Sequence, residues 1–162
     1  MHEQTCPVCG MHLDDSTLCA DHQGITYYFC MPQCRENFLA RPKLYLGQHS
    51  PKKQGHQIIK CRSFVLDQPV DAMHRDYLCA HLNQLMSVRN IRIEGSTVSI
   101  DYDLIEITAG QIEQALIEAG NRLGSGWGER FKRGWIHYTE ENELDNLASG
   151  DAACCNKPQA KG

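Results

Sequence analysis

Four cysteines near the N-terminus constrain this chain more than any other feature. They form the pattern Cys-x2-Cys-x20-Cys-x3-Cys and are Cys6, Cys9, Cys30 and Cys34. Two thiolates separated by two residues can hold one ion from a tight turn, and two separated by three residues fit the first turn of a helix. Four thiolates complete a tetrahedral shell that suits Zn²⁺ or another soft ion. A segment of under about 50 residues cannot easily build a sufficient apolar core, so we expect its folding to require the metal.

The residues around these cysteines resemble the YHS/TRASH family of small metal-binding modules. The resemblance covers about residues 4–47 and rests on Cys-Pro-Val-Cys-Gly-Met at 6–11, Tyr-Tyr-Phe-Cys at 27–30, Cys34, Phe38 and Pro42. It implies a treble-clef-like module over 1–48 that binds metal in sensing or trafficking, as in heavy-metal ATPases and metal sensors. The family spans several metals and also occurs as an accessory in enzymes, so the resemblance names no reaction.

Composition narrows the class of protein further. The chain has 162 residues, a formal net charge of −4, nine Cys and eight His. Clustered cysteines indicate metal or redox chemistry before a disulfide scaffold. The mildly acidic charge makes nucleic acid an unexpected partner, because nonspecific affinity depends on neutralising phosphates. No apolar run approaches the roughly 20 residues that cross a bilayer, and the N-terminus lacks signal-peptide features, so we expect a cytoplasmic protein without membrane insertion.

A polar segment at 49–56 indicates a linker to a second domain at 57–140. Alternating residues predict strands near 59–65, 91–94 and 98–102, and helical periodicity predicts helices at 71–86 and 108–120. Thr108 followed by Gln111 resembles a capping box at the start of the second helix. A last strand is predicted at 135–138. The order βαββαβ is ferredoxin-like, which makes the fold class α+β. In the first strand we expect Ile59, Cys61 and Val65 to face the core.

Residues 57–120, and especially 90–120, look like a heavy-metal-associated domain, the fold of copper chaperones. That family binds Cu(I) through Gly-Met-x-Cys-x-x-Cys, and the equivalent stretch here is 68–74, where Asp71 and His74 stand at the cysteine positions with Met73 between them. The thiolate pair is therefore missing. Either the domain has changed to harder or mixed ligands, with a weak site at Met73 and His74, or it is a scaffold or docking surface.

The segment 122–135 interleaves basic and aromatic residues. They are Arg122, Trp127, Arg130, Phe131, Lys132, Arg133 and Trp135. Such a mixture suits base stacking with phosphate contacts, docking to an acidic partner such as another heavy-metal domain, or a loop whose aromatic side chains pack on the domain. Because the flanking segments are acidic, we expect packing. The acidic segment and tail at 141–162 carry the vicinal pair Cys154 and Cys155, which can capture a soft ion or exchange a disulfide.

These observations predict a non-enzymatic protein that binds one Zn²⁺ or Cu⁺ at the four-cysteine site. Its expected role is to bind, sequester or deliver copper, zinc or mercury-like ions by thiolate exchange. The expected partners are a heavy-metal transport ATPase or another metal-binding protein. The alternative is an interaction module for protein or RNA with a purely structural zinc. A thiol oxidoreductase centred on the tail has little support, because only Lys157 near Cys154 could lower a thiol pKa.

Overall fold

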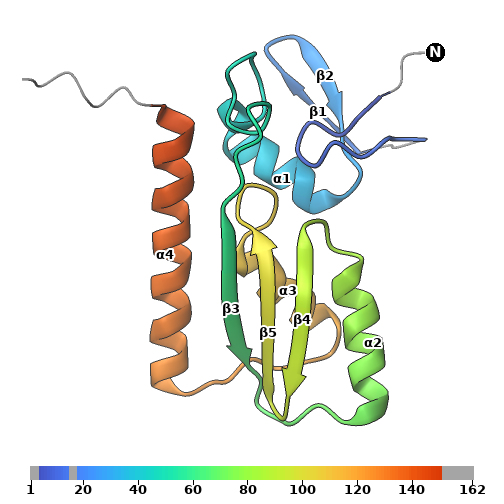
Figure 1. The fold of residues 1–162 in the computed structure, drawn as a ribbon, viewed down its shortest axis with the longest axis vertical. Coiled ribbons are helices and arrows are strands. Elements are labelled where there is room, and N and C mark those ends of the chain that lie inside the picture. The colour runs from blue at the N-terminus through green and yellow to red at the C-terminus, as the bar shows by residue number, and fades with distance from the viewer. Residues whose placement is uncertain (1–3, 15–17, 151–162) are drawn as a thin grey trace, which may run out of the picture.

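The computed structural model describes residues 4–14 and 18–150. It is an α+β fold with a two-stranded sheet near the N-terminus, a three-stranded antiparallel sheet below it, and helices around both (Figure 1). The elements in order are β1 (Cys19–His22), β2 (Ile25–Tyr28), α1 (Pro32–Ala40), the 3₁₀ turn η1 (Pro42–Leu44), β3 (Ile59–Val65), α2 (Ala72–Asn83), β4 (Val88–Glu94), β5 (Thr97–Asp103), α3 (Ala109–Glu118) and α4 (Trp127–Ser149).

The three-stranded sheet has the strand order β3-β5-β4. Along the chain, the elements follow one another as β3, α2, β4, β5 and α3, which confirms the first five elements of the predicted βαββαβ order. The central strand β5 buries Val98, Ile100 and Tyr102 on one face, beneath α2 and α3. Asp71 caps α2 by accepting a hydrogen bond from the His74 backbone N–H at 2.7 Å, and the predicted capping box of Thr108 and Gln111 begins α3.

The predicted last strand at 135–138 is wrong, because these residues lie in the middle of the 23-residue helix α4. Ile136, Glu140 and Leu144 recur at helical spacing and face the domain, and that burial outweighs the low helix propensity of Gly128 and Gly134. The helix lies alongside the edge strand β3, where a fourth strand would have paired (Figure 1).

Glu140 is the residue that ties α4 to the rest of the domain. Its carboxylate is 2% exposed, accepts a hydrogen bond from the Tyr102 hydroxyl and accepts another from the Ala109 backbone N–H at 2.9 Å. The Arg62 Nε lies 3.7 Å from it. Burial and the bond to Glu140 raise the pKa of Tyr102, so this hydroxyl stays protonated and donates. One carboxylate thus joins β3, β5, α3 and α4.

The prediction of which β3 residues face the core is also wrong. The strand alternates as predicted, but Ile59 and Cys61 lie exposed on the open face of the sheet, while Phe64 is buried. Lys60 and Arg62 lie on the same side as Phe64, because α4 brings Glu143 and Glu140 to them. Paired carboxylates make this placement of cations tolerable, and hydrophobicity alone does not reveal them.

The N-terminal module packs directly on the second domain. The buried Tyr45 hydroxyl donates to the Ile105 carbonyl at 2.7 Å, and Asn37 Nδ2 donates to the Glu106 carbonyl at 2.6 Å. Lys52, in the segment expected to be a linker, forms an ion pair with the Glu106 side chain. A single cluster of buried apolar residues runs through both parts. Within the described residues, no helix is long and apolar enough to span a bilayer.

We predict that Glu140→Ala lowers the free energy of unfolding by about 3 kcal/mol, because the Tyr102 hydroxyl, the Ala109 N–H and the Arg62 guanidinium all lose a buried partner. Glu141→Ala removes the neighbouring carboxylate on the same helix, which is exposed, and is the matched control; it should change the free energy of unfolding by less than about 0.5 kcal/mol. Urea unfolding followed by circular dichroism measures both. Equal stability of the two variants would contradict this role of Glu140.

Candidate metal centre

The four N-terminal cysteines lie together around a common point. All four Sγ atoms lie within 4.8 Å of one another, with Cys9 to Cys30 at 3.4 Å and Cys30 to Cys34 at 3.6 Å. A tetrahedral ion with metal–sulfur bonds of about 2.3 Å places its sulfurs about 3.8 Å apart. The seven described cysteines are all free thiols. The cluster therefore has the composition and the spacing to hold one metal ion.

A tight turn presents the first two cysteines. The Cys6 N–H donates to the Met11 carbonyl at 2.9 Å, and the Gly10 N–H donates to the Cys6 carbonyl at 2.8 Å. Gly10 has φ +78°, in the left-handed region where glycine has no Cβ penalty. The turn folds the chain back so that Cys6 and Cys9 face the same point, which the Cys-x2-Cys spacing predicts.

The second pair comes from the junction between β2 and α1. Cys30 lies just after β2, and Cys34 stands in the first turn of α1, which begins at Pro32. Proline suits this position because its missing N–H would be unpaired there in any case. The positive end of the α1 dipole consequently lies beside the thiolates, which favours their charge.

A cluster of aromatic side chains packs next to the second pair of cysteines. The Phe38 ring packs against Tyr27, Phe29 and Tyr45, with ring centroids 4.9, 5.1 and 6.4 Å away. Phe29 and Phe38 are fully buried. Phe29 immediately precedes Cys30 and Phe38 lies one turn after Cys34, so the same core positions both cysteines.

The metal-free thiols share protons. A hydrogen bond from Cys34 lowers the pKa of Cys6, and the same bond raises the pKa of Cys34. Burial, followed by the contact with Cys9, raises the pKa of Cys30 to about 12. Four neighbouring thiolates repel one another, so complete ionisation requires a cation among them. A bound metal supplies that charge and displaces the remaining protons.

Access to the cluster differs between its two sides. Cys6 and Cys34 are buried, whereas Cys9 and Cys30 are half-buried. An incoming ligand can thus approach the ion from the side of Cys9 and Cys30. Cys19 is the exposed thiol of the module, and it does not belong to the cluster.

Among residues 4–14 and 18–150, the cluster is the one group of three or more Cys, His, Asp or Glu side chains placed to hold an ion. Cys154 and Cys155 lie outside the described residues. The ligand role of the four cysteines stays a prediction until a bound metal is measured.

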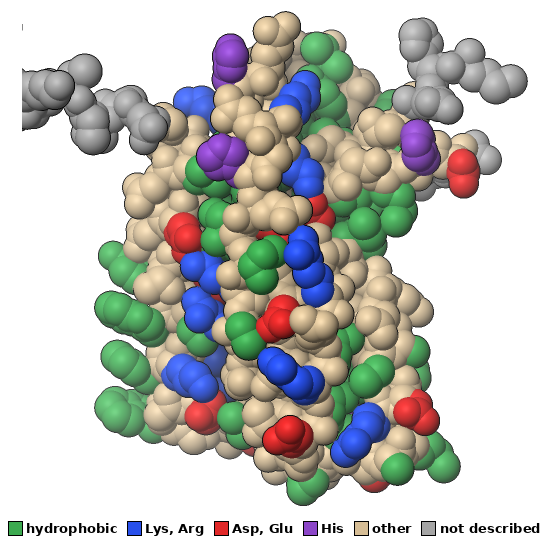
Figure 2. All heavy atoms as spheres, viewed as in Figure 1, with side chains coloured by type: hydrophobic (Ala, Val, Ile, Leu, Met, Phe, Trp, Pro, Cys, Tyr) green, Lys and Arg blue, Asp and Glu red, His purple; other side chains and the backbone are tan. Residues whose placement is uncertain are grey.

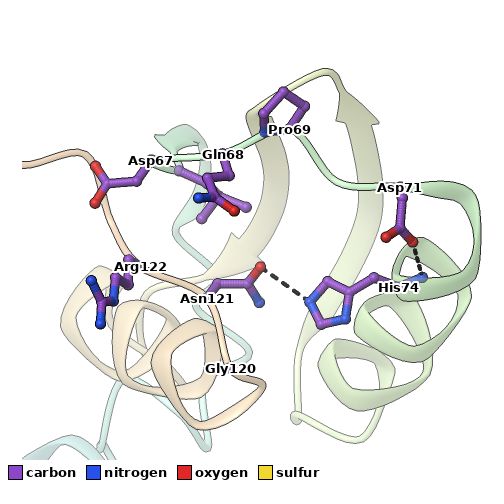
Figure 3. A pocket seen from close by; sticks show the side chains of 9 residues that line it. Asp67, Gln68, Pro69, Asp71, His74, Gly120, Asn121 and Arg122 are labelled. Atoms are coloured by element: carbon purple, nitrogen blue, oxygen red, sulfur yellow. Dashed lines mark hydrogen bonds between the residues drawn. The ribbon is translucent and has the colours of Figure 1, made fainter.

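The Asp71, Met73 and His74 region adjoins a polar pocket of about 340 Å³ at the β3–α2 junction (Figure 3). Asp71 is engaged in capping α2, and His74 Nε2 lies 3.2 Å from Asn121 Oδ1. Met73 is 87% exposed. Asp71 and His74 take part in local hydrogen bonds, and neither belongs to the group of Cys, His, Asp and Glu side chains that is placed to hold an ion. A weak site at Met73 and His74 stays a prediction.

Sequence reasoning missed the exposure of the aromatic residues on α4. Trp127, Phe131 and Trp135 were expected to pack on the domain from a loop, and that expectation is wrong, because they lie exposed on the helix. The spacing of four residues between these aromatic side chains is typical of one face of a helix, and this spacing is the sequence signal that indicates a helix here. Nearby glycines favoured a loop and obscured it.

We predict that Cys34→Ser destabilises the N-terminal module in zinc-containing buffer and lowers zinc content, because it removes a buried ligand. Cys61→Ser changes a cysteine on the open sheet face and is the matched control. Thermal unfolding with metal analysis measures both. A Cys34→Ser protein that binds zinc as tightly as the wild type would exclude Cys34 as a ligand.

Metal affinity should increase with pH. Cys30 and Cys34 hold protons at neutral pH because their thiol pKa values are raised, so metal binding must release them. We expect the apparent affinity to rise about tenfold per pH unit for each proton displaced between about pH 6.5 and 8. Competition with a chelator of known pH dependence measures this. A pH-independent affinity would contradict thiol ligation.

Comparison with known families agrees with this site. The family model of the YHS domain matches residues 5–49, which contain all four cysteines. No family match identifies the rest of the chain. No curated protein and no solved structure matches the chain. The chain therefore carries a YHS domain at residues 5–49, built around a four-cysteine cluster.

Proposed function

We propose that this protein binds one soft or borderline metal ion, Zn²⁺ or Cu⁺, at the four-cysteine cluster and sequesters or delivers it by thiolate exchange. The observation that carries the proposal is the convergence of four Sγ atoms within 4.8 Å of one another. Sulfur-only donor sets favour copper(I), zinc and similar ions over magnesium or calcium. The match to the YHS domain supports metal binding as the role of this module.

The uneven burial of the ligands supports exchange rather than permanent retention. An incoming thiolate can bond to the ion from the side of Cys9 and Cys30 while one of these two thiolates leaves it. One metal–sulfur bond forms as another breaks, and the oxidation state of the ion does not change. Cys6 and Cys34, which are buried, would hold the ion during the step.

The proposed role is non-enzymatic, and the proposed recipient is another thiol-bearing metal protein such as a heavy-metal transport ATPase. The second domain then acts as a scaffold for the cluster. Its buried loop at 104–107 accepts the contacts of Tyr45 and Asn37, which hold the metal module in place.

A second candidate function is an interaction module for a protein or RNA whose zinc is purely structural. The continuity of the core favours it, since Cys6, Cys34 and the second domain belong to one buried cluster. A metal embedded in that core would stabilise the fold without leaving it. The two candidates therefore differ in the exchange rate of the metal.

Metal exchange distinguishes them. Zinc-loaded protein is mixed anaerobically with Cu⁺ held by a weak competing thiol, and released zinc is followed with a chromophoric chelator. We expect one zinc per chain, displaced by copper within minutes. We also expect faster zinc release from Cys30→Ser than from Cys61→Ser, because serine at position 30 removes one of the four thiolate ligands, whereas Cys61 lies outside the cluster. Zinc that stays bound for many hours in the folded protein would favour the structural role.

A further inference from the structure

Helix α4 carries a row of exposed aromatic side chains, which we call the aromatic stripe. Its members are Trp127, Phe131, Trp135 and Tyr138, with exposed fractions of 85%, 65%, 59% and 61%. Their spacing places them on one face of the helix. Figure 2 shows hydrophobic side chains projecting in a row along the α4 edge of the molecule. Trp127 stacks on Phe131, and Trp135 lies against Tyr138, both with ring centroids 6.1 Å apart.

Such a row is unusual on a surface that only meets water. Contiguous exposed apolar patches mark interaction sites, and Trp and Tyr dominate the energetic centres of protein interfaces. Gly128 and Gly134 lie beside the stripe, and a Cβ added at either would meet nothing within 4 Å. Bare backbone next to large rings leaves room for another helix to approach closely.

The charges along α4 indicate which partner fits. Arg130, Lys132 and Glu141 are exposed, and none of them forms an ion pair within the described part of the chain. Arg130 and Glu141 are eleven residues apart, which is close to three full turns, so both lie along the same edge of the aromatic stripe. About 16 Å of helix axis separates them. Lys132 lies on the opposite edge of the stripe.

We propose that the aromatic stripe docks against α4 of a second copy of this chain, with the two helices antiparallel. A two-fold axis between antiparallel helices sets the same edge of each stripe against the other. Arg130 of each copy then meets Glu141 of the other, and symmetry makes that pair twice. The midpoint of the two positions falls at Trp135, so the two copies of this indole meet at the centre of the contact.

Other occupants fit this face less well. A parallel copy would set opposite edges together and place Arg130 beside Lys132 of the other copy, which are like charges. An anionic membrane or a nucleic acid would attract Arg130 and Lys132 but repel Glu141 on the same face. The charge pattern is therefore complementary to itself when the helix is reversed.

The size of the aromatic stripe sets the expected strength. An aromatic residue buries roughly 150–250 Å² of surface when it is fully covered. Multiplied by the exposed fractions of its four members, this gives the aromatic stripe about 500 Å² of surface to bury in each copy and about 1,000 Å² in the dimer. Stable interfaces bury about 1,200–2,000 Å², so this dimer should be weak and reversible, in the micromolar range or above. The aromatic stripe begins at the end of α4 remote from the metal module (Figure 1), so both metal centres stay accessible in the dimer.

Sedimentation velocity of the full-length zinc-loaded protein tests the proposal, over about 1 µM to 1 mM, a range that brackets the expected affinity. We expect reversible dimerisation that Trp135→Ala weakens at least about tenfold, since Trp is the strongest anchor in such interfaces. Tyr77→Ala removes an aromatic side chain that is 55% exposed on α2 and is the matched control. A wild-type protein that stays monomeric at about 1 mM overturns the proposal.

Charge reversal tests the antiparallel arrangement. Arg130→Glu alone and Glu141→Lys alone each turn two attractive pairs into two repulsive ones, so each variant should dimerise about tenfold more weakly than the wild type. An equimolar mixture of the two should form a heterodimer of wild-type affinity, because every pair is again attractive. The variant that carries both substitutions in one chain should also dimerise with about the affinity of the wild type. Both residues are exposed, and circular dichroism checks the fold of each variant. A mixture no tighter than either variant alone, or sedimentation of the monomer with anionic vesicles, would overturn a second copy as the occupant.

Discussion

Repulsion among four gathered sulfur atoms is the constraint on which the N-terminal module of this structure depends. Their Sγ atoms lie within 4.8 Å of one another, a spacing that four thiolates cannot maintain without a cation between them. The hydrogen bonds among the thiols leave Cys34 protonated beside a Cys6 whose pKa is lowered, which is a partial substitute for a metal. We therefore expect an ion that replaces those protons to stabilise this small module.

The second domain holds this module by a few buried polar contacts rather than by apolar area alone. Tyr45 reaches the Ile105 carbonyl from the module, and Glu140 fixes α4 against Tyr102 and the start of α3. Both contacts lie in the continuous core, so we expect a metal bound in the module to stabilise the second domain as well. A scaffold of this kind gives the cluster a fixed accessible side, where Cys9 and Cys30 are half-buried.

The sequence predicted most reliably what depends on short-range spacing. The cysteine pattern anticipated the cluster, because a turn and a helix start determine which thiols can meet, and the capping residues Thr108 and Gln111 anticipated the start of α3. Alternation identified β3 but not its inner face, because that face depends on carboxylates brought by α4 from about 80 positions away in the chain. Long-range ion pairs leave no periodic trace in the strand itself. Helix α4 shows the same limit: 135–138 resembles a strand, yet burial of Glu140 and Leu144 makes the helix continuous and leaves Trp135 on its outer face.

X-ray absorption at the zinc edge of the full-length protein tests the central claim most directly, because it reports the atoms bonded to the ion. The account predicts a shell of four sulfur atoms at about 2.3 Å with no nitrogen or oxygen ligand. A shell containing histidine nitrogen or fewer than four sulfurs would contradict it, since the ion would then lie away from the cluster formed by Cys6, Cys9, Cys30 and Cys34.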